Sequence, residues 1–270
     1  MNAPEDILER IVATKSREVD VLRKHLSELW TGVEDTPPPR NFSGCLRDSN
    51  SVAVIAEIKR CSPGAGPIRP DLDPLRLARS YEFHGASAIS VLTDSEYFGG
   101  SLEDLRMVRN LVDVPILRKD FIVDESQIYE SRTAGADAVL LIVSILDNDR
   151  IRSFRELAED LGMSALVEAH SGAEVERALG SGACLLGVNN RNLSTFETRI
   201  EVTLDLAAQV PSDVVLISES GIFTGEDVSA LGMTGVDAVL VGESLLRQES
   251  PGKGISNLLG YMKGGREDRE

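Results

Sequence analysis

The sequence predicts an α/β fold, a closed (β/α)8 barrel with an N-terminal helical extension. Four apolar runs, each led by a glycine, recur at a spacing of about 50 residues. These runs are GASAISVL from Gly85, GADAVLLIV from Gly135, GACLLGVNN from Gly182 and GVDAVLVGES from Gly235. A second set of β-rich runs lies between them: VAVIAEIK, VPILRKD, MSALVEAH and VVLISES. Eight short strands in about 220 residues are typical of this barrel.

Amphipathic stretches between the strands supply the helices. DPLRLARSYEFHG, SLEDLRMVRNLV, DNDRIRSFRELAEDLG and SGAEVERALGSG all carry apolar residues at helical spacing. Near-continuous apolar strands that alternate with helices indicate a parallel sheet covered by helices. The alternative is an open doubly wound sheet, but no G-x-G-x-x-G follows the first strand. We therefore expect the closed barrel.

The first 50 residues lie outside this repeat. Apolar residues recur there mostly at steps of three and four, so Pro4 to Trp30 is predicted to form one amphipathic helix. TPPPR then ends the helix as a stiff connector. Such an extension either plugs the bottom of the barrel or arches over its top, and the sequence leaves both open. We expect a single domain, divided into the extension (1–50), the barrel (51–262) and a frayed tail (263–270).

Composition narrows the class of protein. Apolar residues make up 42% of the 270 residues and aromatic residues only 4%, so the core must be aliphatic. The net charge of −16 argues against nucleic acid and anionic membranes as partners, since both select basic surfaces. The N-terminus has no basic segment followed by an apolar one, and no apolar run approaches the length of a membrane span. We expect a cytoplasmic protein.

Cysteine and histidine give no metal or disulfide signal. The cysteines are odd in number and widely spaced, which fits neither a disulfide framework nor a zinc site. They are Cys45, Cys61 and Cys184. The histidines share no ligand-like spacing and are expected to be ordinary packing or surface residues. They are His25, His84 and His170.

Charged residues stand at the carboxyl ends of the predicted strands, where barrels place their active sites. Glu57 and Lys59 are two residues apart on the first strand, so their side chains leave the same face. Ala53 and Ile55 share that parity. Because those apolar residues should fill the barrel, Glu57 and Lys59 are predicted to point into its mouth.

Three further strands repeat this arrangement. Lys119 ends the third, Glu168 ends the fifth, and Asn189 with Arg191 ends the sixth. A single such residue would more often be structural, but four strands with inward ionisable or amide groups favour chemistry. We also expect a positive funnel in an acidic body, which would steer an anion. The predicted funnel consists of Lys59, Arg60, Arg118, Lys119 and Arg191.

The last two strands end in SESGI and LVGES. Gly221 and Gly242 follow apolar strands and precede short helical stretches, where barrels often seat a phosphate on backbone N–H groups. Hydroxyl donors that could join them belong to Ser62, Ser220 and Ser244. Glu243 should point away from a phosphate. Glu219 has the opposite parity to Ser220, and which of the two enters the mouth is open.

Seven motifs follow one another along the barrel: AEIKRCSPGAG, VLTDSEYFGGS, LRKDFIVDESQIYESRTAGADAVLLI, LVEAHS, GVNNRNL, SESGI and DAVLVGESLL. This ordered set closely resembles the indole-3-glycerol phosphate synthase family, TIM-barrel lyases of tryptophan biosynthesis that also carry a helical extension. The resemblance implies a reaction on 1-(2-carboxyphenylamino)-1-deoxyribulose 5-phosphate: pyrrole ring closure, decarboxylation and dehydration. It implies no cofactor and no metal. Partners would be the phosphorylated substrate and a second copy of the chain or other tryptophan-pathway enzymes.

The resemblance also implies roles for the residues that match the motifs. Lys119 would be the general acid at the ketone, and Lys59 would pair with the substrate carboxylate and could donate a proton. Glu168 would assist dehydration, Glu57 would orient the lysines, and Asn189 would hydrogen-bond the substrate hydroxyls. Phosphate would bind at Ser62, Ser220, Gly221, Gly242 and Glu243, and Arg191 would join Asn189 on the same wall.

The aromatic ring of the substrate would lie in an apolar slot, although ordinary filling of the barrel explains these residues equally well. The slot residues are Phe121, Leu140, Ile142 and Leu193. We therefore expect substrate binding by Ser62, Phe121, Leu140, Ile142, Arg191, Leu193, Glu219, Ser220, Gly221, Gly242, Glu243 and Ser244.

Other functions remain open from the residues alone. An aldolase-type barrel would form a Schiff base on Lys59 or Lys119 with a ketone. Phosphoribosylanthranilate isomerase, another barrel, would need an acid–base pair such as Cys and Asp instead of paired lysines. A barrel that only binds phosphorylated metabolites, or serves as an assembly subunit, is the non-enzymatic alternative, and the number of inward ionisable groups argues against it.

Overall fold

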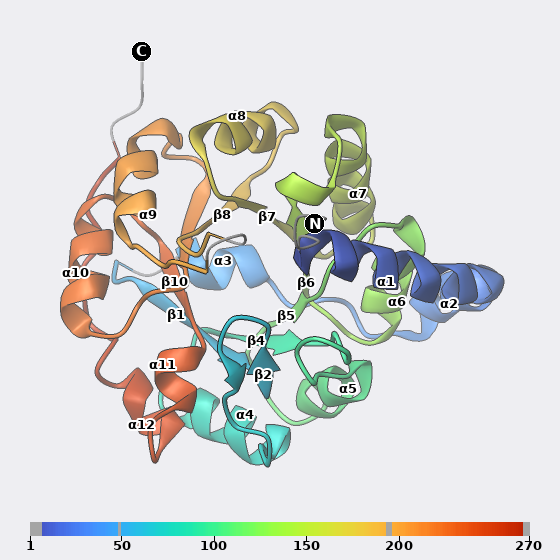
Figure 1. Ribbon diagram of the computed structural model, residues 1–270, viewed down its shortest axis with the longest axis horizontal. Coiled ribbons are helices and arrows are strands. Elements are labelled where there is room, and N and C mark those ends of the chain that lie inside the picture. Colours follow the sequence, from blue (N-terminus) through green and yellow to red (C-terminus); the bar gives the residue numbers. More distant parts are fainter. Residues whose placement is uncertain (1–6, 48–49, 193–195, 267–270) are drawn as a thin grey trace, which may run out of the picture.

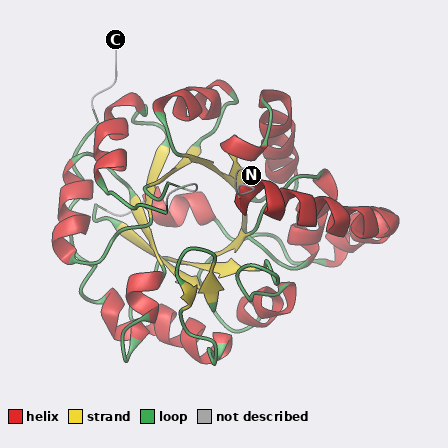
Figure 2. Cartoon of the chain, in the orientation of Figure 1, coloured by secondary structure: helices red, strands yellow, loops and turns green. Residues whose placement is uncertain are grey.

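Eight parallel strands close into a barrel ringed by helices (Figures 1 and 2). The computed structural model describes residues 7–47, 50–192 and 196–266. The barrel strands are β1 (Ala53–Ile58), β4 (Ala88–Leu92), β5 (Ile116–Lys119), β6 (Ala138–Ile142), β7 (Ser164–Ala169), β8 (Leu185–Asn189), β9 (Val215–Glu219) and β10 (Ala238–Val241). Each pairs with its neighbour in the chain, and β1 pairs with β10 to complete the circle. The predicted (β/α)8 barrel is confirmed.

Six of the nine described helices outside the barrel begin at a side-chain cap. The nine helices are α4 (Pro74–Phe83), α5 (Leu102–Arg109), α6 (Glu125–Thr133), α7 (Asn148–Asp160), α8 (Gly172–Gly180), α9 (Glu201–Leu206), α10 (Gly225–Met233), α11 (Glu243–Leu246) and α12 (Pro251–Ile255). Side-chain oxygens that accept from first-turn N–H groups belong to Asp73, Ser101, Asp124, Asp147, Ser171 and Thr224. A small hairpin of β2 (Cys61–Ser62) and β3 (Gly66–Pro67) follows β1.

Strand residues alternate between two apolar clusters. One cluster lies inside the barrel and includes Ile55 of β1, Leu117 of β5 and Leu166 of β7. The other lies between the sheet and the helices and contains the residues of opposite parity, such as Val54 and Val167. Because the period along a strand is two, the residue two positions beyond an inner residue continues the inner row. This alternation directs the polar strand ends into the barrel mouth.

The helical extension covers both ends of the barrel. Helix α3 (Phe42–Arg47) buries Phe42 and Leu46 in the inner cluster, next to residues that begin their strands, such as Ala53 and Val215. Helix α1 (Ile7–Leu22) lies at the opposite end, where its apolar side chains line the mouth. The sequence left these two positions open as alternatives, and the extension occupies both.

The prediction of one continuous helix from Pro4 to Trp30 is wrong. Within the described residues, α1 ends at Leu22, a 3-10 turn spans Arg23–His25, and α2 (Leu26–Asp35) continues five residues beyond Trp30. The guanidinium of Arg23 pairs with Asp124, the N-cap of α6, at 2.5 Å, and α2 packs against α6. The turn thus joins a helix over the mouth to a helix on the outer ring.

The C-terminal segment is attached to the barrel as far as it is described. Lys263 Nζ and Arg266 Nη2 lie 3.6 Å and 2.9 Å from the carboxylate of Asp237, which precedes β10. Residues 267–270 lie outside the described part, so the frayed tail stays a prediction. Among the described helices, none has the length and apolar character needed to cross a membrane.

Phe42→Ala should destabilise the protein by about 3 to 5 kcal/mol, because it empties a fully buried site at the closed end of the barrel. The measurement is the free energy of unfolding from urea titration followed by circular dichroism. Phe83→Ala, at a position 86% exposed, is the matched control and should change stability by less than about 0.5 kcal/mol. Equal effects of the two variants would show that α3 is not part of the core.

Candidate active site

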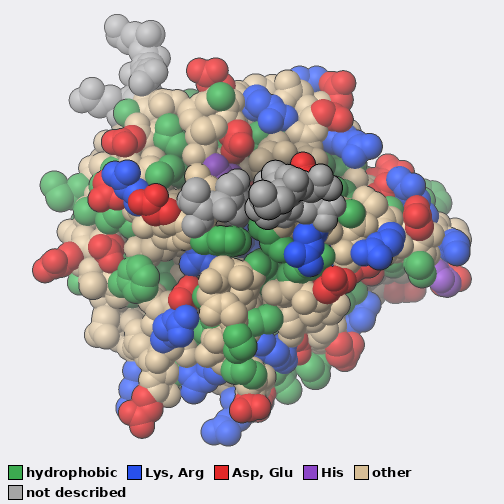
Figure 3. Space-filling model, in the orientation of Figure 1, with side chains coloured by type: hydrophobic (Ala, Val, Ile, Leu, Met, Phe, Trp, Pro, Cys, Tyr) green, Lys and Arg blue, Asp and Glu red, His purple; other side chains and the backbone are tan. Residues whose placement is uncertain are grey.

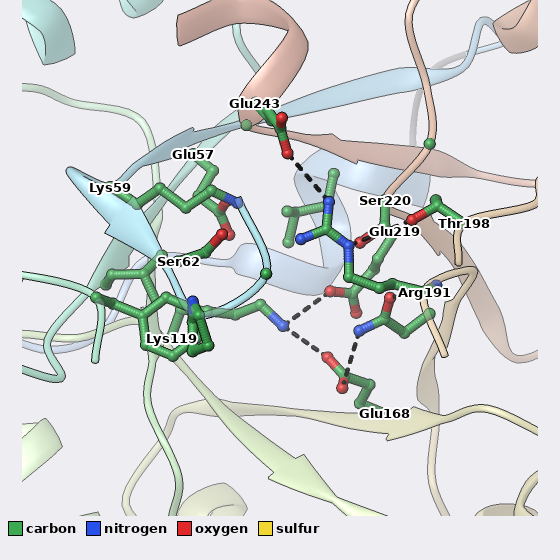
Figure 4. Close-up of a pocket in the computed structure, with 18 of the residues that line it drawn as sticks. Glu57, Lys59, Ser62, Lys119, Glu168, Arg191, Thr198, Glu219, Ser220 and Glu243 are labelled. Atoms are coloured by element: carbon green, nitrogen blue, oxygen red, sulfur yellow. Dashed lines mark hydrogen bonds and ion pairs between the residues drawn. The ribbon is translucent and has the colours of Figure 1, made fainter. Parts of the chain in front are cut away.

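The carboxyl ends of the strands open into one pocket (Figure 4), and apolar residues of α1 line part of it. All the described residues predicted to act on or bind a substrate line this pocket. They are Glu57, Lys59, Ser62, Lys119, Phe121, Leu140, Ile142, Glu168, Asn189, Arg191, Glu219, Ser220, Gly221, Gly242, Glu243 and Ser244. Leu193 lies outside the described residues. The structure therefore brings together predicted groups from seven of the eight strand ends, and Leu92 of β4 adds the eighth.

Lys119 lies at the centre of the pocket between two carboxylates (Figure 4). Its Nζ is 2.6 Å from Glu168 Oε2 and 2.9 Å from Glu219 Oε2. The amide Nδ2 of Asn189 donates to the other oxygen of Glu168 at 3.2 Å. One ammonium on β5 thus joins β7, β8 and β9 across the mouth.

The two carboxylates that share Lys119 have opposite pKa shifts. Burial raises the pKa of Glu219 to about 7, and the negative charges of Glu168 and Glu57 add to this against the opposing effect of Lys119. Burial acts on Glu168 in the same direction, but Lys119, His170 and the Asn189 hydrogen bond outweigh it and lower its pKa. Glu219 therefore holds a proton into the neutral range, while Glu168 stays ionised.

A lack of hydrogen-bond donors within the described part of the chain explains why Glu219, and not Glu168, takes up the proton. Apart from the ion pair with Lys119, neither oxygen of this side chain has a hydrogen-bond donor among the described residues, and only 1% of the residue is exposed. Burial also acts to lower the pKa of Lys119, but Glu168, Glu219 and Glu57 raise it above its ordinary value. Lys119 is consequently an ammonium at every pH near neutral.

Lys59 and Glu57 form a second ion pair, on the β1 side of the pocket (Figure 4). The backbone of Gly242, at the end of β10, runs directly against this pair. A Cβ at Gly242 would lie 2.2 Å from Glu57 Oε2, so a larger residue here would displace the Glu57 carboxylate. The predicted inward direction of Glu57 and Lys59 agrees with their positions.

The chain turns sharply after β9, which decides between Glu219 and Ser220. Glu219 continues the inner row from Val215 and Ile217 and enters the pocket. Ser220 and Gly221 both have positive φ angles, 68° and 75°. Left-handed backbone is strained for serine, and the Ser220 carbonyl is held there by a 2.9 Å hydrogen bond from Asn190 Nδ2. The backbone of this turn forms the pocket wall.

Polar side chains that follow β8 and β10 are already paired with other groups of the protein. The hydroxyl of Ser244 donates to the Ile222 carbonyl at 2.7 Å, which ties the loop after β10 to the loop after β9. Arg191 Nη2 lies 3.1 Å from Glu243 Oε2, and Arg247 pairs with the other oxygen at 2.8 Å (Figure 4). Burial acts to raise the pKa of Glu243, but these two guanidinium groups lower it and neutralise its charge.

The positive funnel is smaller than predicted. Arg118 leaves the outer face of β5 and is buried against Asp120 and Glu130, at 3.1 Å and 2.8 Å. Arg60 pairs with Asp104 at 2.6 Å, outside the pocket lining. The prediction was wrong for both because it placed arginines by sequence position without their partners. Figure 3 shows hydrophobic side chains gathered near the centre of this face and charged side chains of both signs around its periphery.

An apolar slot lies beside the charged cluster. Phe121, Leu140 and Ile142 line it, and Phe98 adds an aromatic ring whose centroid is 5.9 Å from that of Phe121. Helix α1 contributes further apolar side chains that the sequence analysis did not include. They are Ile7, Leu8 and Ile11. These residues could not be assigned to the pocket from the sequence, because periodicity alone does not show where the extension lies.

A buried lysine fixes α1 over the mouth. Lys15 is 2% exposed, and its Nζ lies 2.9 Å from Asp94 Oδ2 and 3.0 Å from Asp120 Oδ1. Asp120 directly follows the central Lys119. The available sequence signal was the lysine at a four-residue step between Ile11 and Val19, on the apolar face of the helix. A lysine at this position in the pattern does not by itself indicate a function.

Comparison with known proteins identifies relatives along nearly the whole chain. The family model described as "Indole-3-glycerol phosphate synthase" matches residues 8–258. A protein of that name from Chloroherpeton thalassium is 47% identical over 247 residues, 90% of this chain and 95% of the relative. Another, from Laribacter hongkongensis, is 46% identical over 259 residues, 94% of this chain and 98% of the relative.

A solved structure shows similarity in fold alone. Thiamine phosphate pyrophosphorylase from Pyrococcus furiosus superposes with a TM-score of 0.57 at 18% sequence identity. The match covers 77% of this chain and 94% of that one. At this level of identity the likeness supports the barrel and says nothing about the reaction.

Glu219→Gln should stabilise the protein increasingly as pH rises from mildly acidic to alkaline. The reference pKa of glutamate is 4.5 and the folded value is about 7, so the folded wild type binds the proton more tightly than the unfolded chain. That contribution is complete below the unfolded pKa and is lost as pH rises through the folded one. The measurement is the unfolding free energy at several pH values. Glu226→Gln, at an exposed position, is the control and should show no such trend.

An opposite trend, with wild type gaining on Glu219→Gln as pH rises, would contradict the raised pKa. Equal behaviour of the two glutamine variants would do the same.

Proposed function

The chain belongs to the indole-3-glycerol phosphate synthase family, and on this premise we propose how its pocket performs the reaction of these carboxy-lyases. The substrate is 1-(2-carboxyphenylamino)-1-deoxyribulose 5-phosphate, and the product is indole-3-glycerol phosphate of tryptophan biosynthesis. Ring closure, loss of CO2 and loss of water require proton donors and an acceptor around one small anion. The observation that carries the proposal is the ammonium of Lys119, held between Glu168 and Glu219 at the pocket centre.

Lys119 acts as the general acid in ring closure. A ring carbon attacks the substrate ketone, and the developing alkoxide needs a proton and a positive charge nearby. The pKa of Lys119 is raised by Glu168, Glu219 and Glu57, so the ammonium form is present throughout the neutral range. The two carboxylates also fix its direction.

Lys59 binds the carboxylate of the substrate, which later leaves as CO2. Its ion pair with Glu57 orients the ammonium toward the pocket (Figure 4). Once the substrate carboxylate has left, Lys59 is free to donate a proton to the departing hydroxyl. Glu57 can move that proton because it already contacts the lysine.

Glu168 is the base of the dehydration step. Its lowered pKa keeps it ionised, and Asn189 and Lys119 hold its two oxygens in place. Asn189 also offers its side-chain amide to the substrate hydroxyls. Glu219 lies next to Lys119. Burial raises its pKa to about 7, so it supplies a second proton within the cluster.

The phosphate binds on the opposite wall. Ser220, Gly221, Gly242 and Glu243 line this wall together with Arg191. Their backbone N–H groups would hold the phosphate, and Arg191 would add a positive charge. Ser62 offers its hydroxyl from the first loop. The Ser244 hydroxyl donates to Ile222, so Ser244 would contribute through its backbone amide. The apolar slot, with Phe121, receives the aromatic ring.

The aldolase alternative is disfavoured by electrostatics. A Schiff base requires a neutral lysine amine, and the carboxylates around Lys119 stabilise its charged form. Borohydride treatment with a keto-sugar phosphate tests this point, and covalent trapping would support the aldolase. A cytoplasmic location, a homodimer and a complex with other pathway enzymes remain predictions from the sequence.

The proposal is tested by one assay. Purified protein is incubated with the carboxyphenylamino-deoxyribulose phosphate, and indole fluorescence and CO2 release are followed together. Both signals should appear at equal rates. Indole fluorescence without CO2, or neither signal, would exclude the proposed reaction.

Lys119→Ala should lower kcat by about 100- to 10,000-fold, because it removes the general acid. Substrate binding should be largely retained, since the phosphate wall and apolar slot are untouched. Steady-state kinetics and equilibrium binding of the substrate measure the two effects separately. Lys253→Ala, at an exposed lysine on α12, is the control. Loss of binding with normal turnover would contradict the role given to Lys119.

A further inference from the structure

A histidine outside the described mechanism lies behind Glu168. His170 comes two residues after Glu168 at the end of β7, and its side chain is 15% exposed. Its Nε2 lies 3.6 Å from Glu168 Oε1. Its Nδ1 lies 3.3 Å from Oε2 of Glu174 in α8, and the same oxygen accepts the His170 main-chain N–H at 2.6 Å. The imidazole is thus held between two carboxylates.

The nitrogen that faces Glu168 has no other use in the described structure. Nε2 is buried and makes no hydrogen bond within the described residues, although Nδ1 is engaged by Glu174. A buried ring nitrogen without a donor or acceptor partner is unfavourable unless it carries a proton toward a nearby negative charge. Glu168 supplies that charge. From the sequence, His170 was expected to be an ordinary packing or surface histidine.

We propose that His170 is a positioning residue for the dehydration: as an imidazolium anchored by Glu174, it holds Glu168 ionised and directed at Lys119. This rests on the role proposed above for Glu168. His170 itself does not reach the substrate, because it does not line the pocket. It acts through the carboxylate in front of it.

Electrostatics supports this reading. Burial acts to lower the pKa of His170, but the hydrogen bond to Glu174 and the charge of Glu168 outweigh it and raise the pKa. Glu219 on β9 acts in the same direction, and Lys119 on β5 lies beyond Glu168. In return, the imidazolium lowers the pKa of Glu168.

The geometry gives each oxygen of Glu168 its own partner. Oε2 contacts Lys119 Nζ at 2.6 Å, and Oε1 accepts from Asn189 at 3.2 Å with His170 nearby at 3.6 Å. The series Glu174, His170, Glu168, Lys119 therefore alternates in charge from the outer helix to the pocket centre. Such alternation is favourable in a buried site, where an unpaired charge is costly.

The first experiment compares pH profiles of kcat for His170→Ala, His170→Gln and wild type. His170→Ala should lose about tenfold in kcat with little change in KM, because Glu168 loses the positive charge beside it. Without the imidazolium the pKa of Glu168 rises, so the acid limb should move to higher pH. His170→Gln keeps a donor without a charge, and it should recover part of kcat while retaining the shifted limb.

His84→Ala is the matched control. His84 is also half-buried, but its Nδ1 contacts the Ser80 carbonyl on α4 at 2.7 Å, outside the pocket lining. Its removal should leave kcat and the acid limb unchanged. An acid limb at the wild-type position in both His170 variants would overturn the proposal.

The second experiment is a double-mutant cycle with Glu168→Gln. If His170 acts through Glu168, its replacement should cost nothing further in kcat once Glu168 has lost its charge. Fully additive losses would indicate a purely structural role and overturn the inference. A Glu168→Gln enzyme with wild-type kcat would instead overturn the role proposed for Glu168, and the inference with it. A crippled Glu168→Gln enzyme with control-like His170 variants would overturn the inference alone.

A measurement on the wild-type enzyme does not depend on how the variants fold. Imidazole ¹⁵N shifts followed over the neutral pH range should show His170 titrating above the ordinary histidine value of about 6.5, and Glu174→Gln should lower that midpoint. A neutral His170 ring at the pH where the enzyme turns over would exclude the imidazolium.

Discussion

The structure of the site depends on one buried ammonium shared by two carboxylates. Lys119 joins Glu168 and Glu219 across the barrel mouth; the two carboxylates are buried, and the lysine side chain is only 12% exposed. Removing Lys119 or Glu168 would leave an uncompensated charge, which is costly in such a setting. Because they share one ammonium, the two glutamates cannot both have their negative charge compensated. One stays charged and the other takes up a proton, so a single constraint produces an acid and a base at the same pH.

The barrel explains how much of this could be predicted from the sequence. A strand has a period of two, so Glu57, Lys119 and Glu168 could be assigned to the mouth from the apolar residues two positions before them. Local pattern did not settle Glu219, because its strand ends in a left-handed turn at Ser220 whose conformation depends on Asn190. The alternation therefore predicted the inward-facing residues of the strands correctly, but it did not decide the direction of Glu219.

Other residues depended on partners far away in the chain. Arg118 was expected near the substrate, but Asp120 and Glu130 bind it on the outer face of its strand. His170 looked unremarkable in sequence because Glu174 and Glu168 matter only once α8 and β7 are packed together. The predicted helix at the start was broken where Arg23 meets the cap of α6. In each case the deciding contact is tertiary, and periodicity carries no information about it.

The ion pairs of Lys15 bear on whether the barrel is separable from its extension. Asp94 and Asp120 are buried at the strand ends, and Lys15 is the cation that α1 brings to them. A shortened chain that began at β1 would leave the buried Asp94 without its cation, whereas Asp120 would keep Arg118. The eight-stranded body therefore shares its charge balance with α1, and a barrel excised at β1 should be less stable than the whole chain.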